Sequence, residues 1–75
     1  MIRYKFDIMQ ALRDRGYDSK KIKTERILSQ ATITAIKRGG NITTDTLNRL
    51  CIILRLQPSD ILEVVPTDEE KIRFF

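Results

Sequence analysis

A short segment in the middle of the chain carries side chains that could read the edges of nucleic-acid bases. Wound as a helix at about 100° per residue, it gathers five side chains on one face, which are Gln30, Ala31, Thr34, Ala35 and Arg38. In the major groove of DNA, glutamine can pair with adenine, alanine and threonine methyls can touch the thymine methyl, and arginine can bind guanine or phosphate. One interpretation of this face is therefore contact with DNA bases.

A second interpretation treats the same face as an ordinary solvated helix surface, and the charge distribution bears on the choice. The net charge of +4 is uneven, because residues 1–40 hold ten Lys or Arg and four Asp or Glu, whereas residues 41–75 hold four and six. A clustered basic surface is typical of phosphate binding, although basic patches also serve solubility. The base-reading interpretation thus depends on the fold around the segment.

The remaining composition excludes several kinds of chemistry. One cysteine and no histidine among 75 residues exclude an internal disulfide, a Cys/His metal site and a His-based catalytic triad within one chain. Cys51 falls among leucines at helical spacing, so we interpret it as a core residue. The acids Asp45, Asp60 and Glu63 have no recognisable catalytic spacing. We therefore expect no enzyme, no metal site and no cofactor.

Length and hydropathy indicate one small domain in the cytoplasm. A chain of this length buries a single small core. It has no apolar run long enough to span a bilayer, and no signal peptide is indicated, so we expect no membrane partner. A lone cysteine fits a reducing cytoplasm, where we expect the protein to be located.

The hydrophobic periodicity predicts an all-α domain of five short helices, after an N-terminal segment that is either a brief edge strand or an extended arm. The first helix stops at Gly16, and Ser19 is placed to cap the second. The third helix carries the candidate base-reading face. Ser29 is its expected N-cap, and Gly39 supplies the left-handed residue that closes its last turn.

The second half of the chain supplies the two remaining helices. Thr43 or Thr44 caps the fourth, whose apolar side chains recur at helical spacing and make it the main contributor to the core. Ser59 caps a short fifth helix, and apolar side chains within residues 61–64 close over the core before Pro66 ends it.

Several of these features resemble the helix-turn-helix DNA-binding domains of the Cro and phage-repressor family, also called the Xre family. Apolar residues stand where the family pattern requires them, at Ile22, Leu28, Ile33 and Ile36. Ser29 and Gln30 resemble the opening of the family's recognition helix, and later segments resemble its fourth and fifth helices.

The resemblance covers roughly residues 1–65 and implies a lambda-repressor-like fold. It places a DNA-binding domain at residues 1–66, with the motif at about 19–38 and the recognition helix at about 29–38. Residues 67–75 form a tail that either frays or packs on the body or on a neighbouring chain.

In such domains the second helix of the motif lies in the major groove, while the N-terminus of the first and the following loop hold phosphates. The resemblance thus assigns base contacts to Gln30, Ala31, Thr34, Ala35 and Arg38. It assigns phosphate contacts to Ser19, Lys20, Lys21, Lys37, Arg38, Asn41 and Thr43 or Thr44.

The turn of the motif departs from the family pattern. Lys23 and Arg26 replace residues that are usually smaller or less polar, and Ile27 stands where the family favours glycine. A left-handed conformation would be strained at Ile27, so the turn is expected to be rebuilt or the second helix extended.

Together these features predict a small transcriptional regulator that binds double-stranded DNA sequence-specifically. The alternative is an antitoxin-like or other protein-interaction module on the same helical fold. The altered turn and the aromatic end Phe74-Phe75 favour that alternative. A homodimer or a partner protein is compatible with both functions.

Overall fold

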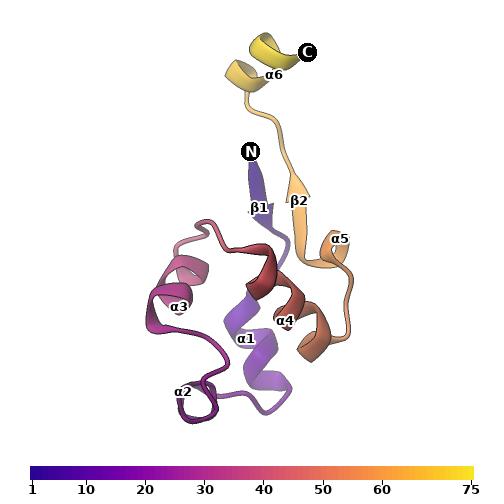
Figure 1. Ribbon diagram of the computed structural model, residues 1–75. Helices are drawn as coiled ribbons and strands as arrows, with labels where there is room; N and C mark the ends of the chain where they lie inside the picture. Colours follow the sequence, from indigo (N-terminus) through magenta and orange to yellow (C-terminus); the bar gives the residue numbers. More distant parts are fainter.

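Six helices and two short strands make up the chain, as seen in a computed structural model that describes residues 1–75 (Figure 1). In chain order they are β1 (Ile2–Tyr4), α1 (Ile8–Asp14), α2 (Ser19–Thr24), α3 (Gln30–Lys37), α4 (Thr44–Leu54), α5 (Pro58–Ile61), β2 (Leu62–Val64) and α6 (Asp68–Phe74). The first five helices and the N-terminal strand correspond to the prediction. The sixth helix and the second strand do not, so the prediction of five helices was wrong by one.

Side-chain caps fix where most helices begin. Ser29 and Thr43 accept hydrogen bonds from the backbone N–H groups three residues ahead, as the sequence predicted. The predicted cap Ser19 was wrong, because Asp18 takes that position and accepts from the Lys21 N–H at 2.8 Å. Ser59 was also wrong, because the N-cap of α5 is Gln57, with Pro58 in the first turn.

The first three helices end in the same way, with a residue of positive φ that lets the chain turn back. Gly16 closes α1 at φ +85° and Gly39 closes α3 at φ +71°, as predicted. At each end the next amide bonds a carbonyl five residues earlier, which is the hydrogen bond of a Schellman motif. Arg26 does the same after α2, at φ +53°, and Arg55 has φ +56° after α4. No glycine marks those two turns.

Ten apolar side chains form the core beneath these helices. They come from α1, α2, α3, α4 and α5, with Leu28 added from the turn of the motif. Leu12, Ile22, Leu50 and Ile61 are completely buried. Cys51 is half-buried and packs against this core, consistent with its interpretation as a packing residue. Each of these five helices is thus held to the body by at least one buried side chain.

The two strands pair antiparallel, with Ile2 opposite Val64 and Tyr4 opposite Leu62. The predicted N-terminal strand is therefore present. The prediction that residues 61–64 close over the core is confirmed for Ile61 and for Leu62, which packs against the core, and is wrong for Val64. Ile61 is buried, whereas Leu62 begins β2 and Val64 is exposed. Arg3 and Glu63 form an ion pair at 2.7 Å on the other face of this ribbon, which accounts for the charged residue between two apolar ones.

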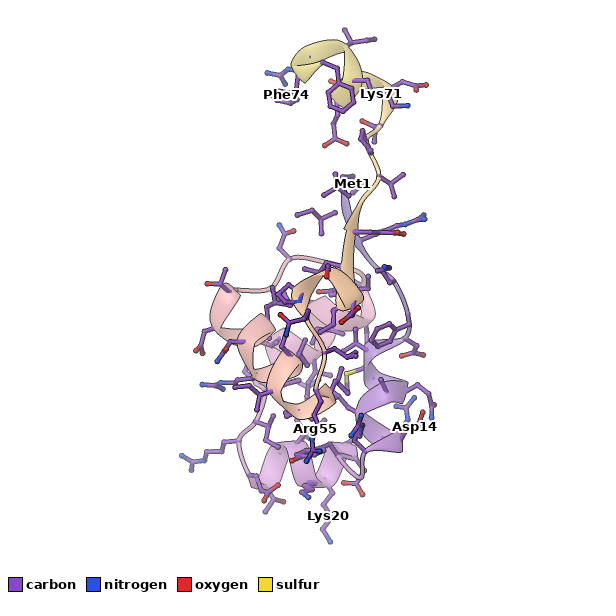
Figure 2. All side chains as sticks on the ribbon, turned by 90° about the vertical axis from the view of Figure 1, so that its right-hand side faces the viewer. Met1, Asp14, Lys20, Arg55, Lys71 and Phe74 are labelled. Atoms are coloured by element: carbon purple, nitrogen blue, oxygen red, sulfur yellow. The ribbon has the colours of Figure 1, made fainter.

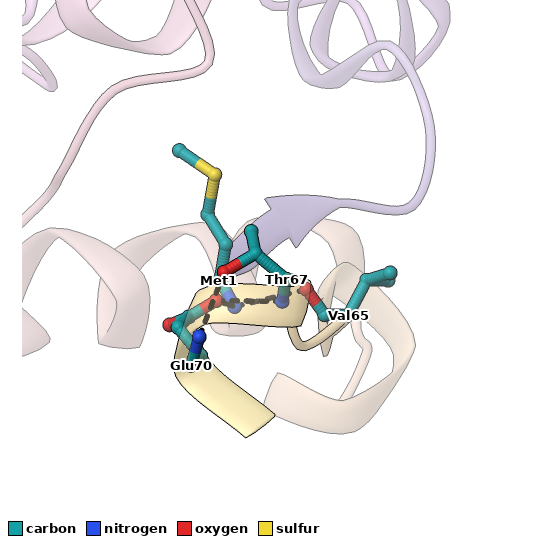
Figure 3. A network of polar contacts seen from close by, with 4 residues as sticks. All are labelled: Met1, Val65, Thr67 and Glu70. Carbon is teal, nitrogen blue, oxygen red and sulfur yellow. Dashed lines mark hydrogen bonds and ion pairs between the residues drawn. The ribbon is translucent and has the colours of Figure 1, made fainter. Parts of the chain in front are cut away.

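Residues 68–74 form α6 at the far end of the ribbon, away from the other helices (Figure 1). Thr67 and Glu70 cap it reciprocally, each side chain accepting from the other's backbone N–H. Figure 3 shows that the N-terminal ammonium of Met1 donates to Glu70 Oε1 and to the carbonyl oxygen of Val65. The tail therefore forms a helix that buries no residue, and it contacts the rest of the chain through the N-terminus.

Candidate nucleic-acid interface

Helix α3 lies at one side of the body (Figure 1). Ile33 and Ile36 are buried and fix its rotation. Gln30 and Ala31 at its N-terminal end are exposed. The Ser29 side chain that caps α3 also lies within 2.9 Å of the Thr32 hydroxyl, which fixes the first turn from which Gln30 projects.

The rest of the predicted face is less open than expected. Thr34 and Ala35 are half-buried, whereas Arg38 just beyond the helix is exposed. Ala35 lies against the loop that follows α3, where a Cβ at Gly40 would come within 3.3 Å of the Ala35 carbonyl oxygen. A glycine at position 40 therefore allows this loop to pack close to α3. Thr34 and Ala35, which both carry a methyl group, thus lie between the exposed Gln30 and Arg38 on this face.

Tyr4 ties the same loop to the ribbon. Its hydroxyl donates to the Gly40 carbonyl oxygen at 2.7 Å, and partial burial raises the pKa of the phenol. Asn41 and Thr43 follow in this loop, Thr43 caps α4 and Thr44 begins that helix. All three are exposed. Three of the predicted phosphate contacts thus lie together beside the C-terminal end of α3.

The other predicted phosphate contacts lie around the ends of α2 and α3. Ser19, Lys20 and Lys21 occupy the first turn of α2 and are exposed, as are Lys37 and Arg38 at the end of α3. In Figure 2, Lys20 projects from the end of the molecule opposite α6. The Lys21 ammonium lies 4.5 Å from the centre of the Tyr17 ring, a cation–π contact that orients it.

None of these lysines or arginines has an acidic partner. The three ion pairs of the chain join the N-terminus to Glu70, Arg3 to Glu63, and Arg49 to Asp45. The positive charges around α2 and α3 are therefore free to meet an anion. Two acids, Asp18 and Glu25, stand at the two ends of α2. The Asp18 carboxylate lies at the N-terminus of α2, where the resemblance placed a phosphate.

In the turn of the motif, the left-handed residue is one that no sequence signal indicated. Arg26, and not Ile27, adopts the positive φ. Ile27 is half-buried, and its N–H bonds the Ile22 carbonyl oxygen at 3.0 Å. Arg49 donates to the Ile27 carbonyl oxygen at 3.0 Å and fixes the turn against α4. The turn is thus rebuilt with Arg26 as its one left-handed residue.

No cluster of three or more Asp, Glu, Cys or His side chains could hold a metal ion. None of the helices combines the length and the apolar character needed to cross a bilayer.

Comparison with known proteins agrees with this geometry. A family model described as the Cro/C1-type HTH DNA-binding domain matches residues 8–67, which includes α1 to α5 and β2. No curated protein and no solved structure matches the chain. The family match covers most of the chain and includes α2, the turn at Arg26 and α3. The chain therefore belongs to the Cro/C1-type helix-turn-helix DNA-binding domain family.

Proposed function

We propose that this protein is a small transcriptional regulator that binds double-stranded DNA sequence-specifically, with α3 in the major groove. The observation that carries the proposal is the surface of α3. A long hydrogen-bonding side chain, Gln30, projects from its capped first turn, and basic residues without acidic partners stand at both ends of the motif. Helix-turn-helix proteins read base edges from the N-terminal part of this helix.

In this proposal Gln30 reads a base edge, and the methyl groups of Ala31, Thr34 and Ala35 contact thymine or fill the groove. Because Thr34 and Ala35 are half-buried, Gln30 carries most of the hydrogen-bonded discrimination. Arg38 stands at the end of the strip, where it reaches either a guanine or a phosphate.

Phosphate contacts come from two places that flank α3. Lys37, Asn41, Thr43 and Thr44 stand on one side, and the first turn of α2 stands on the other. Because the Asp18 carboxylate occupies the N-terminus of α2, we propose that the Ser19, Lys20 and Lys21 side chains hold the phosphate there, with no contribution from the N–H groups at this helix end.

The test is selection of bound sequences from a randomised duplex library at two salt concentrations. We expect a short enriched site. Gln30→Ala should lose about 1–3 kcal/mol of discrimination at one base pair of that site. Lys37→Ala should weaken binding to every sequence alike and reduce the salt slope by about 1. Arg55→Ala is the control, because it removes one positive charge from the end of α4, away from α3 (Figures 1 and 2).

Three outcomes would contradict parts of this proposal. Equal losses on all sequences for Gln30→Ala would remove Gln30 from the base-reading set. Salt-sensitive binding without an enriched sequence would leave a generic phosphate-binding surface. No binding to any duplex would favour the antitoxin-like or other protein-interaction module in place of the regulator.

A further inference from the structure

A groove opens on the body where the N-terminal segment enters α1, beside the end of α3. Its volume is about 470 Å³, within the range of about 300–1,000 Å³ that is usual for small-molecule sites. Residues of β1, α1 and α3 line it, and none of the five predicted base contacts does. Gly39 borders the groove, and no atom lies within 4 Å of the place that a Cβ at this residue would take. The body therefore has room for a small molecule next to the predicted base-reading face.

The floor of the groove is apolar and suits a flat ring. Phe6 lies in the connection between β1 and α1 and is half-buried. Met9 and Ile36 are core residues that reach the groove from α1 and α3. Aromatic rings pack edge-to-face or offset on one another, and methionine sulfur makes favourable contacts with rings. A planar apolar body is thus the part of a ligand that this floor would hold.

Three cations and one acid also line the groove, so it favours an anion. Arg3 is already paired with an acid of β2, and the Asp7 carboxylate is engaged as the N-cap of α1. Arg13 bonds only the neutral side chain of Gln10, and Lys37 has no acidic partner. These two free cations come from the two helices that border the groove. Charge-assisted hydrogen bonds from them are available to an anionic group of the ligand.

Lys37 joins this groove to the proposed DNA interface. It is the last residue of α3 and one of the proposed phosphate contacts. An anion held by Lys37 would take the charge that a DNA phosphate needs, and it would add its own negative charge beside the DNA backbone. Because coupling between two sites is reciprocal, the ligand and DNA would weaken each other's binding.

We propose that the groove binds a small aromatic anion, and that this ligand competes with DNA for Lys37. The ring lies against Phe6, Met9 and Ile36, and the anionic group faces Lys37 and Arg13. The competition rests on the proposed function of α3, whereas the ligand site does not. The DNA-binding body would then itself respond to a small molecule.

The first test is an NMR titration of the full chain, without DNA, with 1-naphthaleneacetate as the probe. The signals of the Gly39 amide and the Met9 methyl group, which line the groove, should shift and saturate with a dissociation constant on the order of 1 mM. Acetate has the charge without the ring, and 1-naphthaleneacetamide has the ring without the charge. Each should bind at least about fivefold more weakly. The methyl signals of Ile72, an exposed residue of α6, should not shift.

Two variants test the cations of the groove. Lys37→Gln and Arg13→Gln each remove one charge from an exposed side chain and should raise the dissociation constant of the probe about two- to fivefold. Arg55→Gln is the matched control, because it removes the same charge from the end of α4 and should leave that constant unchanged. Circular dichroism verifies that all three variants fold. Unchanged binding in either groove variant, equally tight binding of the amide, or a shift of the α6 signal alone would overturn the ligand site.

The second test measures binding of a DNA duplex with the probe at ten times its own dissociation constant. Mutually exclusive binding would raise the dissociation constant of the duplex about tenfold. Sodium acetate at the same concentration matches the ionic strength and should leave it unchanged, and Lys37→Gln should lose the response to the probe. A duplex affinity that the probe does not change would overturn the competition. A chain that binds no duplex would refute the proposed function and the competition together, with the ligand site still decided by the titration.

Discussion

The turn between α2 and α3 offers a direct test of the rebuilt motif. The sequence pattern placed the expected left-handed residue at Ile27, whereas the structure places it at Arg26, with φ +53°. The two positions make opposite predictions for the same substitution. Arg26→Gly should stabilise the domain, because glycine adopts positive φ without a steric penalty. Ile27→Gly should destabilise it, because Ile27 has no positive φ and packs against the core.

The magnitudes follow from the environment of each residue. A left-handed conformation costs a residue with a Cβ about 1–2 kcal/mol. Glycine removes this cost, but its greater conformational entropy in the unfolded chain destabilises the folded state by about 0.5–1 kcal/mol. Arg26→Gly should therefore gain about 0.5–1 kcal/mol. Full burial of isoleucine is worth about 1.5–3 kcal/mol, and Ile27 is half-buried. Losing that packing and adding glycine entropy should make Ile27→Gly cost about 2 kcal/mol.

Urea denaturation followed by circular dichroism measures both changes as shifts in the midpoint at constant slope. In thermal unfolding, 1 kcal/mol corresponds to about 4–8 °C for a domain of this size. Arg26→Ala is the control, since it removes the guanidinium but keeps the Cβ and should gain nothing. If Ile27→Gly raised the midpoint and Arg26→Gly lowered it, the left-handed residue would be at position 27 and the account of this turn would be refuted.

Two further predictions concern the core and the start of α6. Leu50→Ala, at a fully buried position, should lower the free energy of unfolding by about 2–5 kcal/mol. Urea denaturation measures this beside the control Ile52→Ala, which replaces an exposed side chain and should change the free energy of unfolding by less than about 0.5 kcal/mol. The bond from the Met1 ammonium, together with the Thr67 N–H, lowers the pKa of Glu70 from 4.5 to about 2. A lowered carboxyl pKa stabilises the folded form above the ordinary value, so the capped start of α6 should be intact above pH 4.5 and be lost as the pH falls toward 2. The Thr67 amide chemical shift reports this loss, and Glu70→Gln should abolish its titration.

Local signals explain which parts of the fold could be predicted from the sequence. Ser29 and Thr43 were recognised as N-caps because a side-chain oxygen three residues before a free N–H is a feature of the sequence alone. Gly16 and Gly39 were recognised as helix ends for the same reason. The apolar spacing of α4 identified the helix that contributes Leu50 to the core. The family resemblance, confirmed by the match over residues 8–67, rests on these same local patterns.

The errors arise where two local candidates compete or where a distant segment decides. Asp18 and Ser19 are both good caps, and the actual start of α2 depends on how the chain leaves Gly16. Arg26 and Arg55 adopt positive φ without any sequence signal. In each case the next residue, Ile27 or Leu56, packs against the core, and the turn at the arginine directs it there.

The ribbon of β1 and β2 and the helix α6 were the parts least accessible to sequence reasoning. Leu62 and Val64 were assigned to a closing helix because they are apolar, but their strand partners lie some 60 residues earlier, as the Arg3–Glu63 pair shows. A local signal for α6 does exist in Thr67-x-x-Glu70, the capping-box pattern. The predicted base and phosphate contacts are neither confirmed nor contradicted. Their placement is known, but their roles stay predictions until a DNA sequence is bound.

The two kinds of residue in the proposed interface make different contributions to DNA recognition. The chain presents one long hydrogen-bonding side chain on α3, Gln30, and one good bidentate pair is worth only about 1–3 kcal/mol of discrimination. The basic residues at the two ends of the motif bind phosphates of any sequence, so they add affinity without discrimination. On this reasoning Gln30→Ala should lose most of the hydrogen-bonded sequence preference and keep the salt-dependent affinity of the basic residues.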